Sequence, residues 1–524
     1  MRNFSSYGSP DKNTDYYVPR EALISNAIKQ LNSGHYITVW APRQTGKTWI
    51  MQEAISRIEQ EGQFDVVLLS LQFLYEEKDA DIVAQLLAQE LIKQLNLDKL
   101  SINSLKDLHH LFKQGILTKP LILVLDEFDA LDPEVIAKLV AVFRHIYMTR
   151  RNKTTAEKDY LLHGLALIGV RAALGVENVK GSPFNVQRSL HIPNLTHDEV
   201  IDLFDSYQQE RQQVIEPEVV ERIWYEFKGQ PGLTCWFGEL LTETYNQATD
   251  QAIKMTLFEG VYADALNLLP NNNILNIISK AKIEPYKSLV LELFQTQDKI
   301  KFTYRDPLIN FLYMNGVVTV DQVSLGVTYV KFPCPYIQKQ LFDYFARELY
   351  QGMNRLYDPF EDLSDTISTN GIDIRRLLQR YEQYLQANRE MVLKDAPRRS
   401  KDLRVFEAVF QFHLYLYLVS FFNGYEVQVV PEFPTGNGAI DLLMRYAGQL
   451  FGLELKSFAN QPGYRNALKQ AAKYAKNLDV TEIWLVLFVE VVDDQNRQRF
   501  EMDYTDQHGV VVHPVFVQTG SLVE

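Results

Sequence analysis

The segment HYITVWAPRQTGKTW, residues 35–49, decides the fold of the amino-terminal half of this chain. It predicts an apolar strand, a loop of the pattern A-x-x-x-x-G-K-T and an amphipathic helix, in that order. Backbone N–H groups of such a loop, at the start of a helix, cradle phosphate groups. Lys47 would add a positive charge to those phosphates, and the Thr48 hydroxyl would coordinate Mg²⁺. The other loop positions expected at the phosphates are Ala41, which replaces the usual first glycine, and Arg43, Gln44, Thr45 and Gly46.

The expected partner of this loop is KPLILVLDEFDAL, residues 119–131, a continuous apolar strand that ends in two acids. Asp126 would bind Mg²⁺ through water, and Glu127 would polarise the water that attacks the terminal phosphate. The two segments together predict a site for ATP and Mg²⁺ in an α/β fold with a parallel sheet.

Four further segments appear in order along the chain: DYYVPREALISNAIKQL, GLALIGVRAAL, SPFNVQRSLHIPNLTHDEVIDLF and FKGQPGLTCWFGELL. With the loop, they resemble the bacterial AAA-like domain related to the signal-transducing STAND ATPases, over about residues 15–250. The resemblance implies that residues 17–20 lie near the adenine and that GQPGL, residues 229–233, belongs to a helical lid. It also implies that Arg171 reads the γ-phosphate, and a solvated arginine at a strand end is the close alternative.

Three arginines, Arg144, Arg150 and Arg151, lie on or next to the helix expected after the acidic strand. They are candidates for an arginine finger that reaches a neighbouring subunit. A solvated basic helix face is the interpretation that we prefer.

The last third of the chain contains a second pattern of acids. A helix is expected at DLRVFEAVFQFHLYLYL, which carries Glu407, and strands are expected at GAIDLLM, with Asp441, and at LFGLELKS, with Glu454 and Lys456. Residues i and i+2 of a strand point to the same face, so Glu454 and Lys456 would lie side by side, within reach of Asp441. Paired carboxylates hold Mg²⁺, and a lysine beside them can orient the water that attacks a phosphodiester.

These segments resemble the PD-(D/E)XK nuclease superfamily over roughly residues 400–490. The resemblance implies that Asp441 and Glu454 bind Mg²⁺, or alternatively Mn²⁺, and that Lys456 and Glu407 complete the catalytic site. Gln470 and Tyr474 match a QxxxY element on the following helix, where an i, i+4 spacing places both on one face. Two alternatives stay open, a chance D…ExK pattern and an enzymatically inactive member of the superfamily.

Length and composition predict several folded domains. A chain of 524 residues is too long for one core, and 46% hydrophobic with 12% aromatic residues excludes a disordered protein. The fold class is α/β, a P-loop ATPase sheet followed by a mixed α/β PD-(D/E)XK core. The expected divisions are an ATPase core at 1–190, a helical lid at 191–270, a winged-helix-like domain at 271–350, a helical linker at 351–395 and a nuclease domain at 396–524.

Net charge and hydropathy bear on the partners. The net charge of −13 disfavours tight binding to random DNA, but local charge decides the footprint. Basic residues gather at 394–404 and on the QxxxY helix, at Arg465, Lys469, Lys473 and Lys476. Both clusters are candidates for contacts with phosphates. The alternative is that residues 394–404 form a hinge and that the helix residues form an ordinary solvated face. No apolar run of about 18 residues occurs, so we expect a soluble, cytoplasmic protein without a membrane partner.

The function that combines these predictions is an ATP-regulated, Mg²⁺-dependent nuclease that cleaves nucleic acid, with DNA as the expected substrate. The arrangement suggests defence against phage or foreign DNA, an inference from fold analogy alone. We expect the chain to form a homo-oligomer. The alternatives are a STAND-like nucleotide switch and a DNA-remodelling ATPase of a mobile element or repair system, each with an inactive nuclease fold.

Overall fold

The computed structural model describes the chain except residues 1, 6–7, 76, 98–99, 151–158, 170–187, 296–298, 351–352, 354–355, 359, 395–406, 433–440, 459 and 521–524, and except the side chains of residues 295, 407 and 408. It divides into two compact units. The amino-terminal unit comprises Met1–Tyr262, Asn271–Asn273 and Thr303–Val317. The carboxy-terminal unit comprises Ala263–Pro270, Ile274–Phe302 and Val318–Glu524.

The amino-terminal unit contains a five-stranded parallel sheet in the order β2-β3-β4-β1-β5. Its strands are β1 (Tyr36–Trp40), β2 (Asp65–Ser70), β3 (Leu121–Asp126), β4 (Leu162–Gly169) and β5 (Arg188–His191). Because every strand runs in the same direction, all the carboxyl ends meet at one edge of the sheet. The segments predicted to bind phosphate and Mg²⁺ follow β1 and β3 at this edge.

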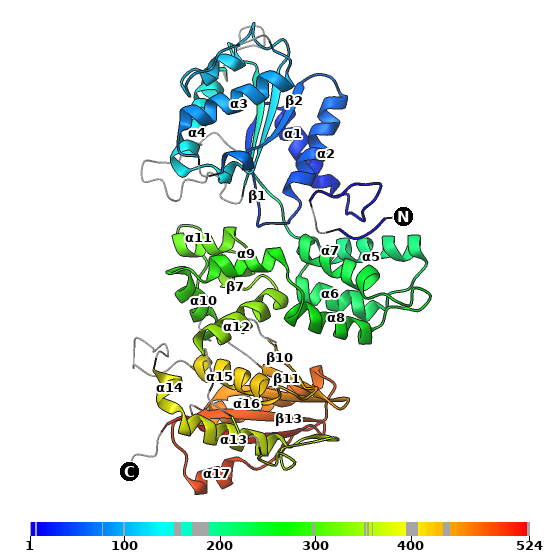
Figure 1. The fold of residues 1–524 in the computed structure, drawn as a ribbon, viewed down its shortest axis with the longest axis vertical. Coiled ribbons are helices and arrows are strands. Elements are labelled where there is room, and N and C mark those ends of the chain that lie inside the picture. Colours follow the sequence, from blue (N-terminus) through cyan, green and yellow to red (C-terminus); the bar gives the residue numbers. More distant parts are fainter. Residues whose placement is uncertain are drawn as a thin grey trace. The chain divides into compact units, whose positions relative to one another are not determined.

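Helices cover both faces of this sheet (Figure 1). Strand residues alternate between the two cores: Ile122 and Val124 of β3 pack with α1 and α2, whereas Leu121, Leu123 and Leu125 pack with α3 and α4. Both faces are buried, which explains why the strand sequence is apolar without a break. The covering helices are α1 (Glu21–Asn32), α2 (Lys47–Gln60), α3 (Ala80–Gln94) and α4 (Pro133–Arg150).

A group of helices follows the sheet in the chain. Helix α5 begins with a capping box, in which Thr196 accepts from the backbone of Glu199 and the Glu199 side chain accepts from the backbone of Thr196. The helices are α5 (His197–Arg211), α6 (Pro217–Phe227), α7 (Pro231–Glu239) and α8 (Met255–Asn267). Helix α11 (Pro307–Met314) also belongs to the amino-terminal unit. After α11 the chain forms a hairpin of β6 (Thr319–Ser324) and β7 (Val327–Lys331) and then α12 (Pro335–Leu349), within the range predicted to be winged-helix-like.

The carboxy-terminal unit contains a six-stranded mixed sheet in the order β10-β11-β12-β13-β15-β14. Strands β10, β11 and β12 are antiparallel neighbours, β12, β13 and β15 are parallel, and β14 is antiparallel to β15. The strands are β10 (Gln428–Glu432), β11 (Asp441–Tyr446), β12 (Gln449–Ser457), β13 (Glu482–Val489), β14 (Tyr504–Thr505) and β15 (Val511–Gln518).

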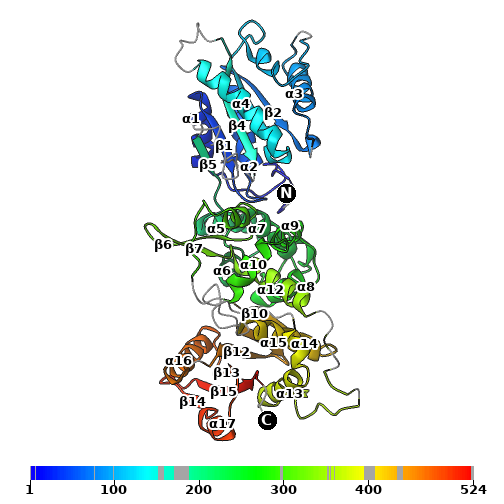
Figure 2. The same cartoon turned by 90° about the vertical axis from the view of Figure 1, so that its left-hand side faces the viewer.

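Helices lie on both sides of the mixed sheet, with α16 on one side of β12 and β13 and α13 on the other (Figure 2). Alanines of α16 pack with Leu485 and Leu487 of β13, while Phe410 of α15 stacks on Phe488 from the opposite face. The remaining elements of this part of the chain are α9 (Asn272–Ala281), α10 (Tyr286–Gln295), β8 (Ile367–Ser368), β9 (Gly371–Ile372), α13 (Ile374–Ala387), α14 (Arg389–Leu393), α15 (Glu407–Phe421), α16 (Gln461–Asn477) and α17 (Asp494–Phe500). Within the described residues, no helix has the length and hydropathy that a membrane crossing requires.

Candidate functional site

The loop between β1 and α2 has the backbone of a phosphate cradle. Gly46, directly before α2, has a φ of 86°, and Gln44 has a φ of 55°. A Cβ built on Gly46 would meet nothing within 4 Å, so the space beside this residue is open. The left-handed backbone at position 46 requires glycine, and the open space in front of it suits a phosphate.

Lys47, the first residue of α2, is folded back onto the loop. Its Nζ donates to the carbonyl oxygens of Ala41, at 2.9 Å, and of Pro42, at 2.7 Å. Burial lowers the pKa of Lys47 to about 8, although Asp129 and Asp126 raise it. Lys47 thus donates to two backbone carbonyls, and the carboxylates of Asp129 and Asp126 act on it only through their charge. A buried ammonium group in such surroundings favours an anionic ligand.

Thr48 and Asp126 lie together at the carboxyl edge of the sheet. The Thr48 hydroxyl donates to Oδ2 of Asp126 at 2.6 Å, and Asp126 is only 7% exposed. A hydroxyl and a carboxylate are oxygen ligands of the kind that Mg²⁺ takes. The residues present therefore fit the Mg²⁺ ion that the loop sequence predicts.

Two residues that the sequence did not indicate interact with the predicted site residues Glu127 and Lys47. Ser70, paired with Asp126 in the β2–β3 register, donates to Oε2 of Glu127 at 2.6 Å. Asp129 raises the pKa of Lys47 and lies against Gly169, where an added Cβ would be 2.6 Å from the Asp129 Oδ1. Both were missed because their roles depend on strand pairing and on a turn after β3.

Glu127 has a left-handed backbone, with φ 54° and ψ 37°. Such a conformation is uncommon for a residue with a Cβ and costs free energy unless neighbouring groups hold it. The hydrogen bond from Ser70 fixes the Glu127 side chain in this position. The structure thus places Glu127 directly after Asp126, with its carboxylate held by Ser70.

The GQPGL segment contacts the phosphate-binding loop directly. Gln230 caps α7 by accepting from the backbone of Leu233, and its amide donates to the carbonyl oxygen of Arg43 at 3.1 Å. The backbone N–H of Gly232 donates to the carbonyl oxygen of Gln44 at 3.1 Å. A Cβ on Gly232 would lie 2.6 Å from the Cβ of Gln44, so only glycine permits this approach.

An aromatic group adjoins the other end of the loop. Trp40, the last residue of β1, packs with Met314 of α11, and Tyr304 and Tyr313 surround the pair. The ring of His191 lies 4.3 Å from that of Trp40. Helix α11 is thereby fastened to the strand that leads into the phosphate-binding loop.

Two of the residues predicted to lie near the nucleotide are Arg20 and Arg171. Arg20, expected near the adenine, donates to the carbonyl oxygens of Pro193 and Asn194 and pairs with Glu199. Arg171 lies outside the described residues. The Arg20 side chain thus binds the segment that precedes α5 and the first turn of that helix.

The interpretation of the α4 arginines as a solvated face is wrong for Arg150. Its side chain is buried, donates to the carbonyl oxygen of Gly34 at 2.5 Å, and lies over the rings of Tyr36 and Tyr147. A buried, stacked guanidinium is a structural group. Arg144 is half-buried, and Arg151 lies outside the described residues.

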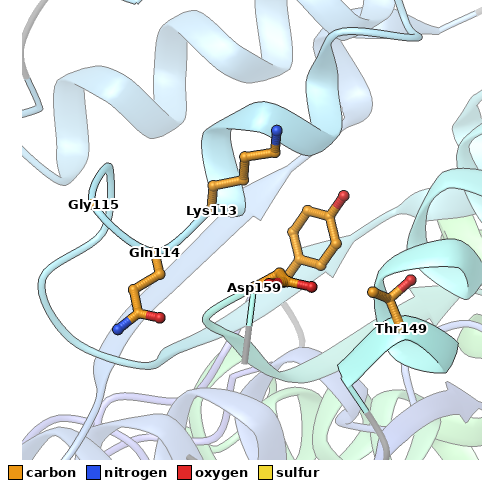
Figure 3. Close-up of a pocket in the computed structure, with 6 residues that line it drawn as sticks. Lys113, Gln114, Gly115, Thr149 and Asp159 are labelled. Carbon is orange, nitrogen blue, oxygen red and sulfur yellow. The ribbon is translucent and has the colours of Figure 1, made fainter. Parts of the chain in front are cut away.

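An open hollow of about 590 Å³ occurs elsewhere in this unit (Figure 3). It is lined by Lys113, Gln114, Gly115, Thr149, Asp159 and Tyr160. These residues precede β3 and β4 or end α4, so the hollow lies at the amino-terminal edge of the parallel sheet. It is separate from the phosphate-binding loop, which follows the carboxyl end of β1.

The acids of the second pattern meet in the mixed sheet. Asp441, at the start of β11, is paired directly with Glu454 of β12 in the antiparallel register. Lys456, two residues later on the same strand, lies 3.2 Å from Oε1 of Glu454. The β12–β13 register places Glu454 and Lys456 beside Leu485 and Leu487, on the face that α16 covers.

Burial governs the chemistry of these acids. Asp441 is 1% exposed and Glu454 is 4% exposed. Burial, and next the charge of Glu454, raise the pKa of Asp441 well above its usual range, and burial raises the pKa of Glu454. Among the described residues, the Oδ1 atom of Asp441 has no hydrogen-bond partner. A buried carboxylate oxygen without a donor suits a divalent cation, so the residues present fit one.

The other predicted residues of this site belong to helices α15 and α16. Tyr474 packs in the core beneath α16, whereas Gln470 is exposed and, among the residues described, has no hydrogen bond to the three charged side chains. Glu407 begins α15, and its side chain is outside what is described. The basic residues of α16 are all exposed: Arg465, Lys469, Lys473 and Lys476. Of the other basic cluster, residues 395–404 lie outside the described part.

Comparison with known proteins identifies the amino-terminal half. The model of the family described as AAA-like domain matches residues 5–269. No curated protein matches the chain.

Solved structures are similar at low identity. The Walker-type ATPase of Pyrococcus abyssi is 15% identical, with 64% of this chain and 99% of that chain covered and a TM-score of 0.38. The ORC1 protein of Aeropyrum pernix, solved with DNA, is 18% identical, with 65% and 97% covered and a TM-score of 0.33. The RuvB Holliday junction branch migration motor of Thermotoga maritima is 14% identical, with 60% and 92% covered and a TM-score of 0.34. The family match, rather than these likenesses, assigns the amino-terminal half of the chain.

The contact between the lid segment and the loop can be tested with Gly232→Ala. The new methyl group would displace Gln44, and we expect ATP affinity to fall by about fivefold or more, because overpacking distorts the phosphate cradle. Titration with a fluorescent ATP analogue measures this loss. Gly260→Ala is the matched control, since a Cβ there, in α8, meets nothing within 4 Å. Equal affinities of the two variants would show that the loop does not depend on this approach.

Proposed function

We propose that this chain, which belongs to the AAA-like domain family, is an ATP-regulated, Mg²⁺-dependent nuclease that cleaves nucleic acid, with DNA as the expected substrate. One observation carries the nuclease part. The buried Asp441, with an oxygen that has no donor among the described residues, lies opposite Glu454, and Lys456 lies 3.2 Å from Glu454. Defence against phage or foreign DNA remains an analogy drawn from the fusion of two modules.

The ATPase part of the proposal follows from four side chains. Lys47 would exchange its two carbonyl acceptors for phosphate oxygens, and Thr48 with Asp126 would hold Mg²⁺. Glu127, oriented by Ser70, would accept a hydrogen bond from the attacking water. When bound, Mg²⁺ neutralises charge on the phosphates.

Two substitutions separate ATP binding from hydrolysis. Lys47→Ala should weaken ATP binding by about tenfold or more, because it removes a charged donor. Glu127→Gln should bind ATP normally and hydrolyse it about 100-fold more slowly, because a carboxamide is a poor base. A fluorescent-nucleotide titration and a phosphate-release assay measure the two effects. Hydrolysis by Glu127→Gln at the wild-type rate would transfer the water-positioning role to another residue.

The cleavage part of the proposal assigns roles to three side chains. Asp441 and Glu454 would hold a divalent cation, which supplies charge neutralisation and a more acidic water when bound. Lys456 would orient the attacking water and lies close enough to Glu454 to be held by it. Gln470, Tyr474 and Glu407 keep the supporting roles that the family resemblance implies.

The exposed basic residues of α16 favour a polyanionic substrate. Their spacing of three to four residues places them on one side of the helix, and α16 covers the sheet face that bears Glu454 and Lys456. Phosphate contacts from such a row would position a nucleic acid strand without reading its sequence. Lys476 also lies 3.6 Å from Asp506, which tempers its charge.

One observation favours the alternative of a nucleotide switch or a DNA-remodelling ATPase with an inactive nuclease fold. In the described part of the chain, no three His, Cys, Asp or Glu side chains are grouped so that they could hold a metal ion. A site with two carboxylates alone binds Mg²⁺ weakly, since the remaining positions fall to water or substrate. The nuclease proposal therefore requires the substrate phosphate, or a further carboxylate, to complete the cation site.

Cleavage of plasmid DNA tests the nuclease proposal. Asp441→Asn and Lys456→Met should each lower the rate by about 100-fold or more with Mg²⁺ or Mn²⁺, because they remove a cation ligand and the group beside the water. Both variants should retain ATP binding, which shows that the amino-terminal unit is intact, and an unchanged circular dichroism melting curve is the control for folding of the carboxy-terminal unit. The proposal fails if wild-type protein cuts no nucleic acid in any nucleotide state, or if Lys456→Met cuts at the wild-type rate.

A further inference from the structure

Glu432 lies in the same row of the sheet as Asp441 and Glu454. It ends β10 and is paired directly with Asp441, which is paired in turn with Glu454. Directly opposed residues of antiparallel strands share a face, and their Cβ atoms are about 4.5–5.5 Å apart. Three carboxylates therefore form a line across three neighbouring strands, and Glu432 is 7% exposed.

Each outer carboxylate of this row has a lysine. Nζ of Lys339, from α12, lies 2.8 Å from Oε1 of Glu432, and the Lys339 side chain is 1% exposed. Lys456 is the corresponding partner of Glu454. The middle carboxylate, Asp441, has an oxygen that no group in the described residues satisfies.

The charges of this row do not balance when all groups are ionised. Counting the described residues of this row alone, three carboxylates and two ammonium groups leave one negative charge, with the three carboxylates buried and Lys456 half-buried. Buried charges are stable when each is paired, and an unpaired one favours capture of a counter-ion. A divalent cation at Asp441 would supply that charge, and Glu432 is within one strand spacing of it.

We propose that Glu432 is a third carboxylate of the cation site and that Lys339 is an internal cation which holds Glu432 while no metal is bound. This inference rests on the proposed function and names a further ligand of the same site. Within the described residues no three His, Cys, Asp or Glu side chains are grouped so that they could hold a metal ion, so the inference requires Glu432 to leave Lys339 when the cation binds.

A purely structural role predicts something different. The Lys339–Glu432 pair would then only fasten α12 to the edge strand β10, and changing it would alter stability without altering cation affinity. If Lys339 competes with the metal for Glu432, its loss must tighten binding of a divalent cation. If Glu432 contributes an oxygen ligand, removing both members of the pair must leave binding weaker than in wild type, although the net charge is unchanged.

The experiment is a titration of the nucleotide-free full chain with Mn²⁺, followed by electron paramagnetic resonance. The binding that Asp441→Asn abolishes defines the site. Lys339→Gln should bind Mn²⁺ about fivefold or more tightly, because it removes a positive charge near a divalent cation while an amide can still donate to Glu432. Glu432→Gln and the double variant should both bind more weakly than wild type. Lys287→Met is the matched control, since it removes the ion pair of α12 at Glu348 and should leave the affinity unchanged.

The outcomes separate this inference from the proposed function. If Asp441→Asn leaves Mn²⁺ binding unchanged, the cation site itself fails, and the nuclease proposal with it. If Asp441→Asn abolishes binding but Lys339→Gln binds no more tightly, or the double variant equals wild type, only the role of Glu432 and Lys339 is overturned. Should Lys339→Gln not fold, Glu432→Asp decides, because it keeps the charge but shortens the reach: weaker binding supports a ligand, and unchanged binding refutes one.

Discussion

A carboxylate buried at the terminus of a strand is the feature on which the candidate site of each unit depends. Asp126 accepts hydrogen bonds from the hydroxyl of Thr48 and from the backbone of Glu127, whereas Asp441 retains an oxygen without a donor among the described residues. Burial of a charge is costly unless a counter-charge or hydrogen bonds offset it. The sheets around these carboxylates are apolar and closely packed, so the unfavourable free energy of burying charge arises at these few acidic residues. A bound cation would lower it.

Sequence alone predicted the parts of this arrangement that are local. The loop before Lys47, the acids after β3 and the pairing of Glu454 with Lys456 all follow from spacing within one segment. Ser70 and Asp129 could not be predicted, because strand pairing and a turn bring them to the site. The prediction for Arg150 was wrong for a related reason. Helical spacing shows that Arg150 lies on α4, but it does not show that the guanidinium group lies over the ring of Tyr36 of β1.

The same limit applies to the carboxy-terminal site. Asp441 and Glu454 were expected to be neighbours, and the β11–β12 register places them opposite each other. Glu432 and Lys339 are separated by 93 residues along the chain and have no motif in common. Only the β10–β11 register and the position of α12 show that they belong to the same row of charges. Buried polar networks are assembled in this way by tertiary contacts, and single-segment patterns do not reveal them.

The chain that leaves the amino-terminal unit at α11 continues directly into the carboxy-terminal unit. Trp40 leads into the phosphate-binding loop and packs on Met314 of α11, from which the chain passes through the β6–β7 hairpin to α12 and Lys339. A nucleotide can regulate the second site only if its contacts differ between two states of such an element. The partners of Trp40 and of Lys339 are the positions where those differences would matter. Such coupling would be reciprocal. If bound nucleotide changed the cation affinity of the second site by some factor, a cation that displaces Lys339 from Glu432 would change the nucleotide affinity by the same factor.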